Sequence, residues 1–97
     1  MKIQVIKEVL DCSNVFPTKT IVFENNIVKN EIFKISYNRK LIFNENLDIP
    51  YFKIIDKMFI IRGALHTNRM TIEFTTNDKI ECDYILEKLI NQITTIN

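Results

Sequence analysis

The sequence predicts an α+β domain in which six to seven short antiparallel strands, arranged as a sandwich or an open barrel, are closed by one C-terminal amphipathic helix. Three observations predict this class. The apolar residues are weighted towards Ile and Phe, which favour strands, and there is a single Ala. Short apolar segments recur at intervals near ten residues, separated by turn-forming residues. A longer apolar segment near the C-terminus has helical periodicity instead.

Length and composition predict one domain, with strands over about 2–76 and the helix over about 78–96. The chain has 97 residues, of which 46% are hydrophobic and 26% charged, as in globular proteins. Polar residues interrupt the N-terminal apolar run, and no apolar stretch is long enough to cross a membrane. We therefore expect a cytoplasmic protein. The many Asn, Lys and Ile residues are typical of an AT-rich genome, including those of plasmids and phages.

The two cysteines, Cys12 and Cys82, are expected to be reduced. They lie far apart and belong to no Cys or His cluster with the spacing of metal ligands. A domain of this size with a sufficient apolar core does not need a disulfide. We expect neither a metal nor another cofactor.

The C-terminal helix has the clearest local signals. Asp78 and Glu81 have the spacing of a capping box, in which the first carboxylate accepts a first-turn amide and the second reaches back to the Asp78 amide. Apolar residues then recur at steps of three and four, at Cys82, Ile85, Leu86, Leu89, Ile90, Ile93 and Ile96. This pattern predicts a helix with one buried face.

Two strands are predicted to form a hairpin directly before this helix. Residues 70–75 alternate strictly between apolar and polar, which puts Met70, Ile72 and Phe74 on the buried face. Residues 58–62 form the other strand, and 66–69 form the turn. Gly63, the single glycine, is expected to mark a bulge.

The earlier strands are shorter and are separated by Asn-rich or Pro-containing breaks. In one of them Phe33, Ile35 and Tyr37 alternate with polar residues, so we expect these side chains to be buried. The predicted segments are 3–10, 20–24, 32–37, 40–43 and 51–56, the last being either a strand or a short helical turn.

This order of elements resembles the pleckstrin-homology-like domains, including bacterial and GRAM-type members. The stretch from Asn68 to Asp78, continuing into Ile80 to Ile93, is similar to the last strand, tight turn and closing helix of these domains. The helix has no Trp, and the loop from Asp11 to Lys19 has no Lys-x-Arg signature. The resemblance therefore implies the fold but not phosphoinositide binding.

Two clusters of basic residues are candidate sites. Arg62, His66 and Arg69 could converge at one end of the predicted hairpin and bind an anion, because guanidinium and imidazole groups donate to phosphate or carboxylate oxygens. The alternative is a solvated loop. Since His66 is the single histidine, a triad or a zinc site would lack its usual partners.

The second cluster is Lys34, Arg39 and Lys40, which lie around a predicted turn. The aromatic residues between them, Phe33, Tyr37 and Phe43, match the mixture of cations and stacking platforms found in nucleic-acid binders. Because these aromatics alternate with the charged residues, core packing is the favoured interpretation.

A non-enzymatic interaction module is the function that these observations favour. The carboxylates show no paired spacing for acid-base catalysis, and one glycine cannot make a phosphate-binding loop. The expected partner is another protein, bound at a sheet edge or at the face beside the closing helix. A nucleic-acid-binding accessory protein of a plasmid or phage is the alternative, although the net charge is only +1. The third alternative is an enzyme subunit with a shared site, and homo-oligomerisation stays open.

Overall fold

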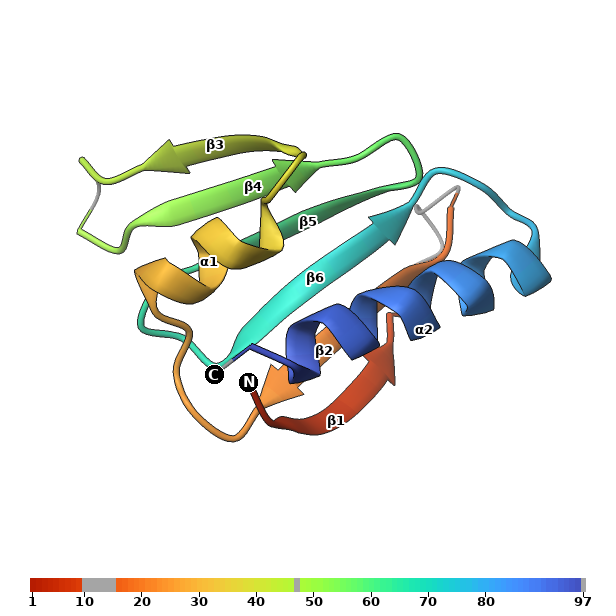
Figure 1. Ribbon diagram of the computed structural model, residues 1–97, viewed down its shortest axis with the longest axis horizontal. Coiled ribbons are helices and arrows are strands. Elements are labelled where there is room, and N and C mark those ends of the chain that lie inside the picture. Colours follow the sequence, from red (N-terminus) through yellow and green to blue (C-terminus); the bar gives the residue numbers. More distant parts are fainter. Residues whose placement is uncertain (10–15, 47, 97) are drawn as a thin grey trace.

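The computed structural model describes residues 1–9, 16–46 and 48–96. In this part of the chain, six strands and two helices follow one another as shown in Figure 1. They are β1 (Ile3–Glu8), β2 (Thr18–Phe23), α1 (Lys29–Ile35), β3 (Lys40–Asn44), β4 (Tyr51–Ile55), β5 (Phe59–Ala64), β6 (Arg69–Phe74) and α2 (Lys79–Thr94).

The strands form one open antiparallel sheet with the order β1-β2-β6-β5-β4-β3. The four strands β3 to β6 form a meander, and β6 returns to pair with β2 of the N-terminal hairpin. Both helices lie on the same face of the sheet (Figure 1). The structure confirms the α+β class with antiparallel strands and a C-terminal helix. It also shows a single open sheet where a sandwich or an open barrel was expected, and a second helix.

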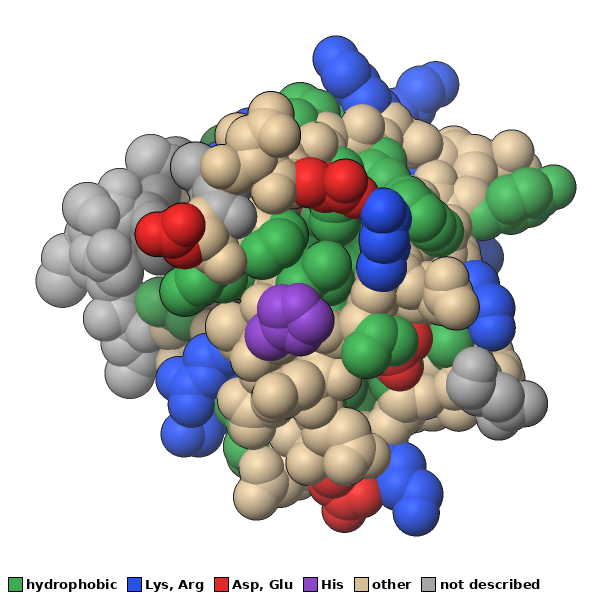
Figure 2. Space-filling view, turned by 90° about the vertical axis from the view of Figure 1, so that its left-hand side faces the viewer, with side chains coloured by type: hydrophobic (Ala, Val, Ile, Leu, Met, Phe, Trp, Pro, Cys, Tyr) green, Lys and Arg blue, Asp and Glu red, His purple; other side chains and the backbone are tan. Residues whose placement is uncertain are grey.

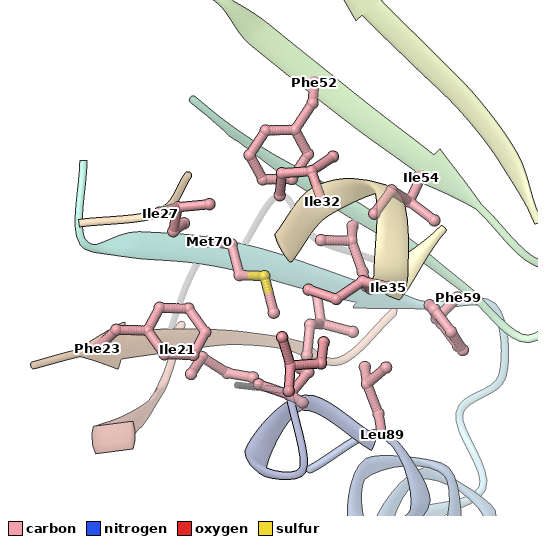
Figure 3. Close-up of a cluster of buried hydrophobic side chains, with 14 of the residues drawn as sticks. Ile21, Phe23, Ile27, Ile32, Ile35, Phe52, Ile54, Phe59, Met70 and Leu89 are labelled. Carbon is pink, nitrogen blue, oxygen red and sulfur yellow. The ribbon is translucent and has the colours of Figure 1, made fainter. Parts of the chain in front are cut away.

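The core lies between the sheet and the two helices. Ile21, Ile54, Ile61 and Ile72 are fully buried on the sheet side. Figure 3 shows side chains from β2, β4, β5, β6 and both helices pointing into this layer. Met70, Ile72 and Phe74 all face it, as the alternation in β6 predicts.

The prediction of a strand over 32–37 was wrong, because residues 32–35 belong to helix α1 and residues 36 and 37 to the turn that follows it. Ile32 and Ile35 are three residues apart and fully buried, whereas Phe33 and Tyr37 are 47% and 75% exposed. Seven residues fit a period of 2 or 3.6 almost equally well, so burial against the sheet decides the conformation. Asn38 follows the helix at φ 60°, a left-handed conformation that Asn tolerates.

Helix α2 begins as predicted at Asp78. The Asp78 Oδ1 accepts hydrogen bonds from the amides of Ile80 and Glu81, at 2.9 and 3.2 Å. The predicted return bond from Glu81 to the Asp78 amide is replaced by a relay through Thr76. The Thr76 hydroxyl accepts from the Asp78 amide at 3.2 Å and donates to the Glu81 carboxylate at 3.3 Å.

The predicted bulge at Gly63 is wrong, because β5 pairs in regular register with β4 and β6 at this residue. The register shift lies instead in β1, between Ile3 and Val5. A Cβ atom on Gly63 would stand 2.6 Å from Cζ of Phe52. Glycine is therefore required for space, since the Phe52 ring lies flush against the backbone.

The expectations about the cysteines and about membrane-spanning segments can be compared with the described residues only. Cys82 is a buried free thiol, but Cys12 and residues 11–15 of the loop before Lys19 lie outside the described residues. Among the residues that are described, no helix combines the length and apolar character needed to cross a bilayer.

Candidate functional site

A groove opens on the helical side of the molecule, between α2 and the turn that joins β4 to β5. Its volume is about 620 Å³. The floor is apolar and consists of the buried side chains of Phe59, Ile85 and Leu89. We call this the α2 groove, and its complete lining is Arg39, Asp56, Met58, Phe59, Glu81, Tyr84, Ile85, Lys88, Leu89 and Gln92.

Arg39 forms the polar end of the α2 groove and joins three parts of the fold. One guanidinium nitrogen, Nη1, donates to the carbonyl of Ile35 at 2.8 Å and to Oε1 of Gln92 at 2.9 Å. Nε donates to Oδ2 of Asp56 at 3.0 Å. The guanidinium also lies 5.1 Å from the centre of the Phe59 ring, within cation-π range. The end of α1, the β4–β5 turn and α2 are thereby tied together.

Asp56 is held as a carboxylate at this end of the groove. Burial raises the pKa of Asp56, but a hydrogen bond from the Met58 amide and the interaction with Arg39 outweigh it. The net result is a pKa below the usual value for aspartate. The ion pair is therefore a fixed element of the groove wall and not a proton donor at neutral pH.

The rim of the α2 groove combines an exposed aromatic ring with charged groups. Tyr84 is 58% exposed, and Nζ of Lys88 lies 4.5 Å from the centre of its ring. Glu81 lines the same groove, one turn before Ile85. An apolar centre with a polar rim that carries charges of both signs is typical of interaction sites.

A second, shallower hollow lies beside the first, over helix α1. It is lined by Asn30, Phe33, Lys34, Tyr37 and Gln92. Gln92 lines both hollows. The ring centres of Phe33 and Phe43 are 6.2 Å apart, which anchors this part of α1 to β3. The expectation that Phe33 and Tyr37 are buried is thus replaced by their exposure on the helical side.

The predicted cluster of Arg62, His66 and Arg69 is not drawn together by any described hydrogen bond or ion pair. Nη1 of Arg62 donates to the Glu73 carboxylate at 2.8 Å. Arg69 is exposed at the start of β6. His66 occupies the β5–β6 turn with φ 65° and is the exposed purple side chain of Figure 2, among green hydrophobic groups.

The predicted cluster of Lys34, Arg39 and Lys40 is divided by the fold. Lys34 is exposed in the last turn of α1, on the hollow described above. Arg39 turns inward to Asp56, while Lys40 is exposed at the start of edge strand β3. Arg39 and Lys40 still line a common hollow together with Asp56, whereas Lys34 lies on a different one, so the three residues do not form one cationic surface.

Cys82 is a free thiol that is buried in the core and has a structural role. It is 5% exposed, and its Sγ donates to the Thr76 carbonyl at 3.4 Å. Burial raises the pKa of the Cys82 thiol, and the nearby carboxylates of Asp83, Glu81 and Asp78 raise it further. Within the described ranges, no three His, Cys, Asp or Glu side chains group in a way that could hold a metal ion.

Sequence reasoning expected a partner at the face beside the closing helix, but it did not find the set of residues that forms the α2 groove, because Arg39, Asp56 and Gln92 are far apart in the chain and have no shared motif. The one local signal in the sequence was the position of Tyr84 outside the apolar repeat of α2. No protein-family model matches this chain, and neither a curated protein nor a solved structure does. The resemblance to pleckstrin-homology-like domains therefore stays a prediction.

Proposed function

We propose that the protein is a small non-enzymatic interaction module that binds a segment of another protein in the α2 groove. The observation that carries this proposal is the groove itself. It is a hollow with an apolar floor, and one wall is fixed by the Arg39–Asp56 ion pair. A preformed site of this kind lowers the conformational cost of binding.

The groove is a better binding site than the sheet edges. Edge strand β1 has an irregular register between Ile3 and Val5, and edge strand β3 begins with Lys40. Irregular pairing and exposed lysines are the features with which natural sheets prevent strand addition. The helical face has no comparable protection, since Tyr37 and Tyr84 are more than half exposed there.

The groove also favours a particular chemistry in the partner. Its floor of Phe59, Ile85 and Leu89 would accommodate an aliphatic or aromatic side chain, the kind of anchor that dominates protein interfaces. Glu81 and Lys88 on the rim would pair with charged groups next to that anchor. We therefore expect an amphipathic segment with one large apolar residue and flanking charges of both signs.

A cytoplasmic location is part of the proposal. Cys82 is a free, buried thiol, which fits a reducing compartment, where disulfides are rare.

A phage-displayed library of random peptides provides the test, because it requires no known partner. Purified protein should enrich peptides that contain an aromatic or aliphatic anchor. Tyr84→Ser should weaken the binding of these peptides about tenfold, which corresponds to about 1.4 kcal/mol. The matched control is Ile42→Ser, which removes a 41% exposed side chain from β3, outside the groove.

Amide chemical shifts in NMR spectra then locate the bound peptide. The proposal predicts perturbations in α2 and in the β4–β5 turn. Perturbations confined to the edges β1 and β3, equal binding to both variants, or no enriched peptide would contradict it. Self-association that is abolished by Tyr84→Ser would identify a second copy of the chain as the occupant and would replace the proposed partner.

A further inference from the structure

The face of the sheet that neither helix covers carries a row of hydrogen-bond donors. Strand register places five side chains in consecutive, directly opposed positions across β4, β5, β6, β2 and β1. These are Lys53, Arg62, Thr71, Thr20 and Lys7, which we call the donor row. Neighbouring strands are about 4.8 Å apart, so the row extends over roughly 19 Å. All five side chains are at least partly accessible to solvent.

The alternation of the strands establishes which face this is. The residues next to the donor row, such as Ile54, Ile61 and Ile72, are fully buried beneath the helices. Successive side chains of a strand point to opposite faces, so the donor row lies on the side away from the helices. Figure 1 shows both helices on the near side of the sheet.

The uncovered face is strongly cationic, although the whole chain has a net charge of only +1. Besides the three cations of the donor row, Lys40 and Arg69 lie on it at positions set by the same register. Among the strand residues described on this face, Glu73 is the only acid, and it is paired with Arg62. Acidic residues are thus concentrated elsewhere on the molecule.

One feature of the donor row works against folding. Lys53 and Arg62 are directly opposite each other on β4 and β5. Like charges in this position destabilise a sheet, because their Cβ atoms are only about 5 Å apart. Among the described residues, no carboxylate is within 4 Å of the Lys53 ammonium group. Arg62 forms an ion pair with a single carboxylate, that of Glu73. A negatively charged ligand would relieve this repulsion, and the Arg62 guanidinium keeps further N–H groups to donate.

We infer that this face binds single-stranded nucleic acid, with the backbone phosphates along the donor row. Ammonium, guanidinium and hydroxyl groups are the side-chain donors that contact phosphates in such complexes. Apolar side chains lie on both sides of the row, about 7 Å away along the strands. Ile55 and Ile60 are on one side and Tyr51 is on the other.

These flanking apolar groups favour a single strand over a duplex. Bases of a single strand are free to lie against Ile55 and Ile60 or to stack on the Tyr51 ring, whereas a duplex hides its base faces. The surface is on the opposite side of the sheet from the α2 groove, so this inference does not depend on the proposed function.

Fluorescence anisotropy with labelled oligothymidine of about 16 nucleotides tests the inference. Three cations in contact with phosphates predict that log K falls with log salt with a slope of about −2, measured between about 50 and 200 mM KCl. The double variant Lys7→Gln, Lys53→Gln should weaken binding at least about tenfold and reduce the slope to about −0.7. Lys79→Gln, an exposed cation on α2, is the matched control and should change neither value.

Several outcomes would overturn the inference. These are no binding at the lowest salt, equal losses in the double variant and in Lys79→Gln, and a duplex of the same length that binds as tightly as the single strand. Binding to phosphatidylserine vesicles without binding to oligothymidine would assign the face to a membrane surface instead. Thermal melts of the double variant and the control, neither of which should fall below that of the parent protein, establish that the losses are not due to unfolding.

Discussion

Replacing Leu89 by Ala should show that helix α2 is an integral part of the fold. Leu89 is 2% exposed and belongs to the core cluster, together with Ile85 and Ile93 of the same helix. The substitution removes three buried carbon atoms, worth about 2.4 kcal/mol at about 0.8 kcal/mol each. The cavity left behind adds to this, so the expected loss of unfolding free energy is about 2 to 5 kcal/mol.

Urea denaturation followed by far-UV circular dichroism measures this loss. In a domain of this size, each kcal/mol lowers the melting temperature by about 4 to 8 °C, so thermal melts provide an independent reading. Glu87→Ala is the matched control, because Glu87 is exposed on the same helix. Its effect should stay within about 0.5 kcal/mol.

The result that would refute this reasoning is equal stability of the two variants. A chain shortened after Asn77 provides a stricter test. It would leave the apolar sheet face beneath α2, including Ile72 and Phe74, open to water. Net stabilities are only about 5 to 15 kcal/mol, so the shortened chain should not fold. A cooperative melt with an unchanged strand signal would show that α2 is an accessory.

Two further predictions concern the groove wall and the sheet. Asp56→Asn should cost roughly 1.5 kcal/mol at pH 7, near the low end for bonds to a charged group, because the ion pair with Arg39 is partly exposed. Since the folded-state pKa of Asp56 is lowered, its contribution is complete above the unfolded pKa of about 3.9 and is lost as the pH falls through the folded value. Urea titrations should therefore show that the difference in unfolding free energy between the parent protein and the variant decreases as the pH is lowered. A difference that stays constant from neutral to acid pH would contradict an origin in the Asp56 carboxylate. Gly63→Ala should cost about 1 to 3 kcal/mol because its Cβ would overlap the Phe52 ring; Phe52→Leu in the same chain should recover part of the loss, and strictly additive effects would be inconsistent with this contact.

The candidate sites show why sequence reasoning found residues more readily than surfaces. Arg39 was recognised as a cation near other cations, but its role depends on Asp56 and Gln92, which the fold brings from 17 and 53 positions away. The donor row is equally invisible in the sequence, because it exists only once the register of five strands is known. Exposure was also misjudged for Tyr37, since its segment was assigned to a strand.

By itself, the sequence determined the elements whose signals are local. These elements are helix α2, with its cap at Asp78 and its apolar repeat, and strand β6, with its strict alternation. The structure shows the cap hydrogen bonds at Asp78 and buries the apolar face of each element. The tertiary structure alone decided the conformation of α1 and the open, one-sided sheet. The segment around Ile32 and Ile35 fits the period of a helix or of a strand, and packing against the sheet selects the helix. An edge strand has the same local pattern whether or not the sheet closes, so only the pairing of distant strands decides that the sheet is open.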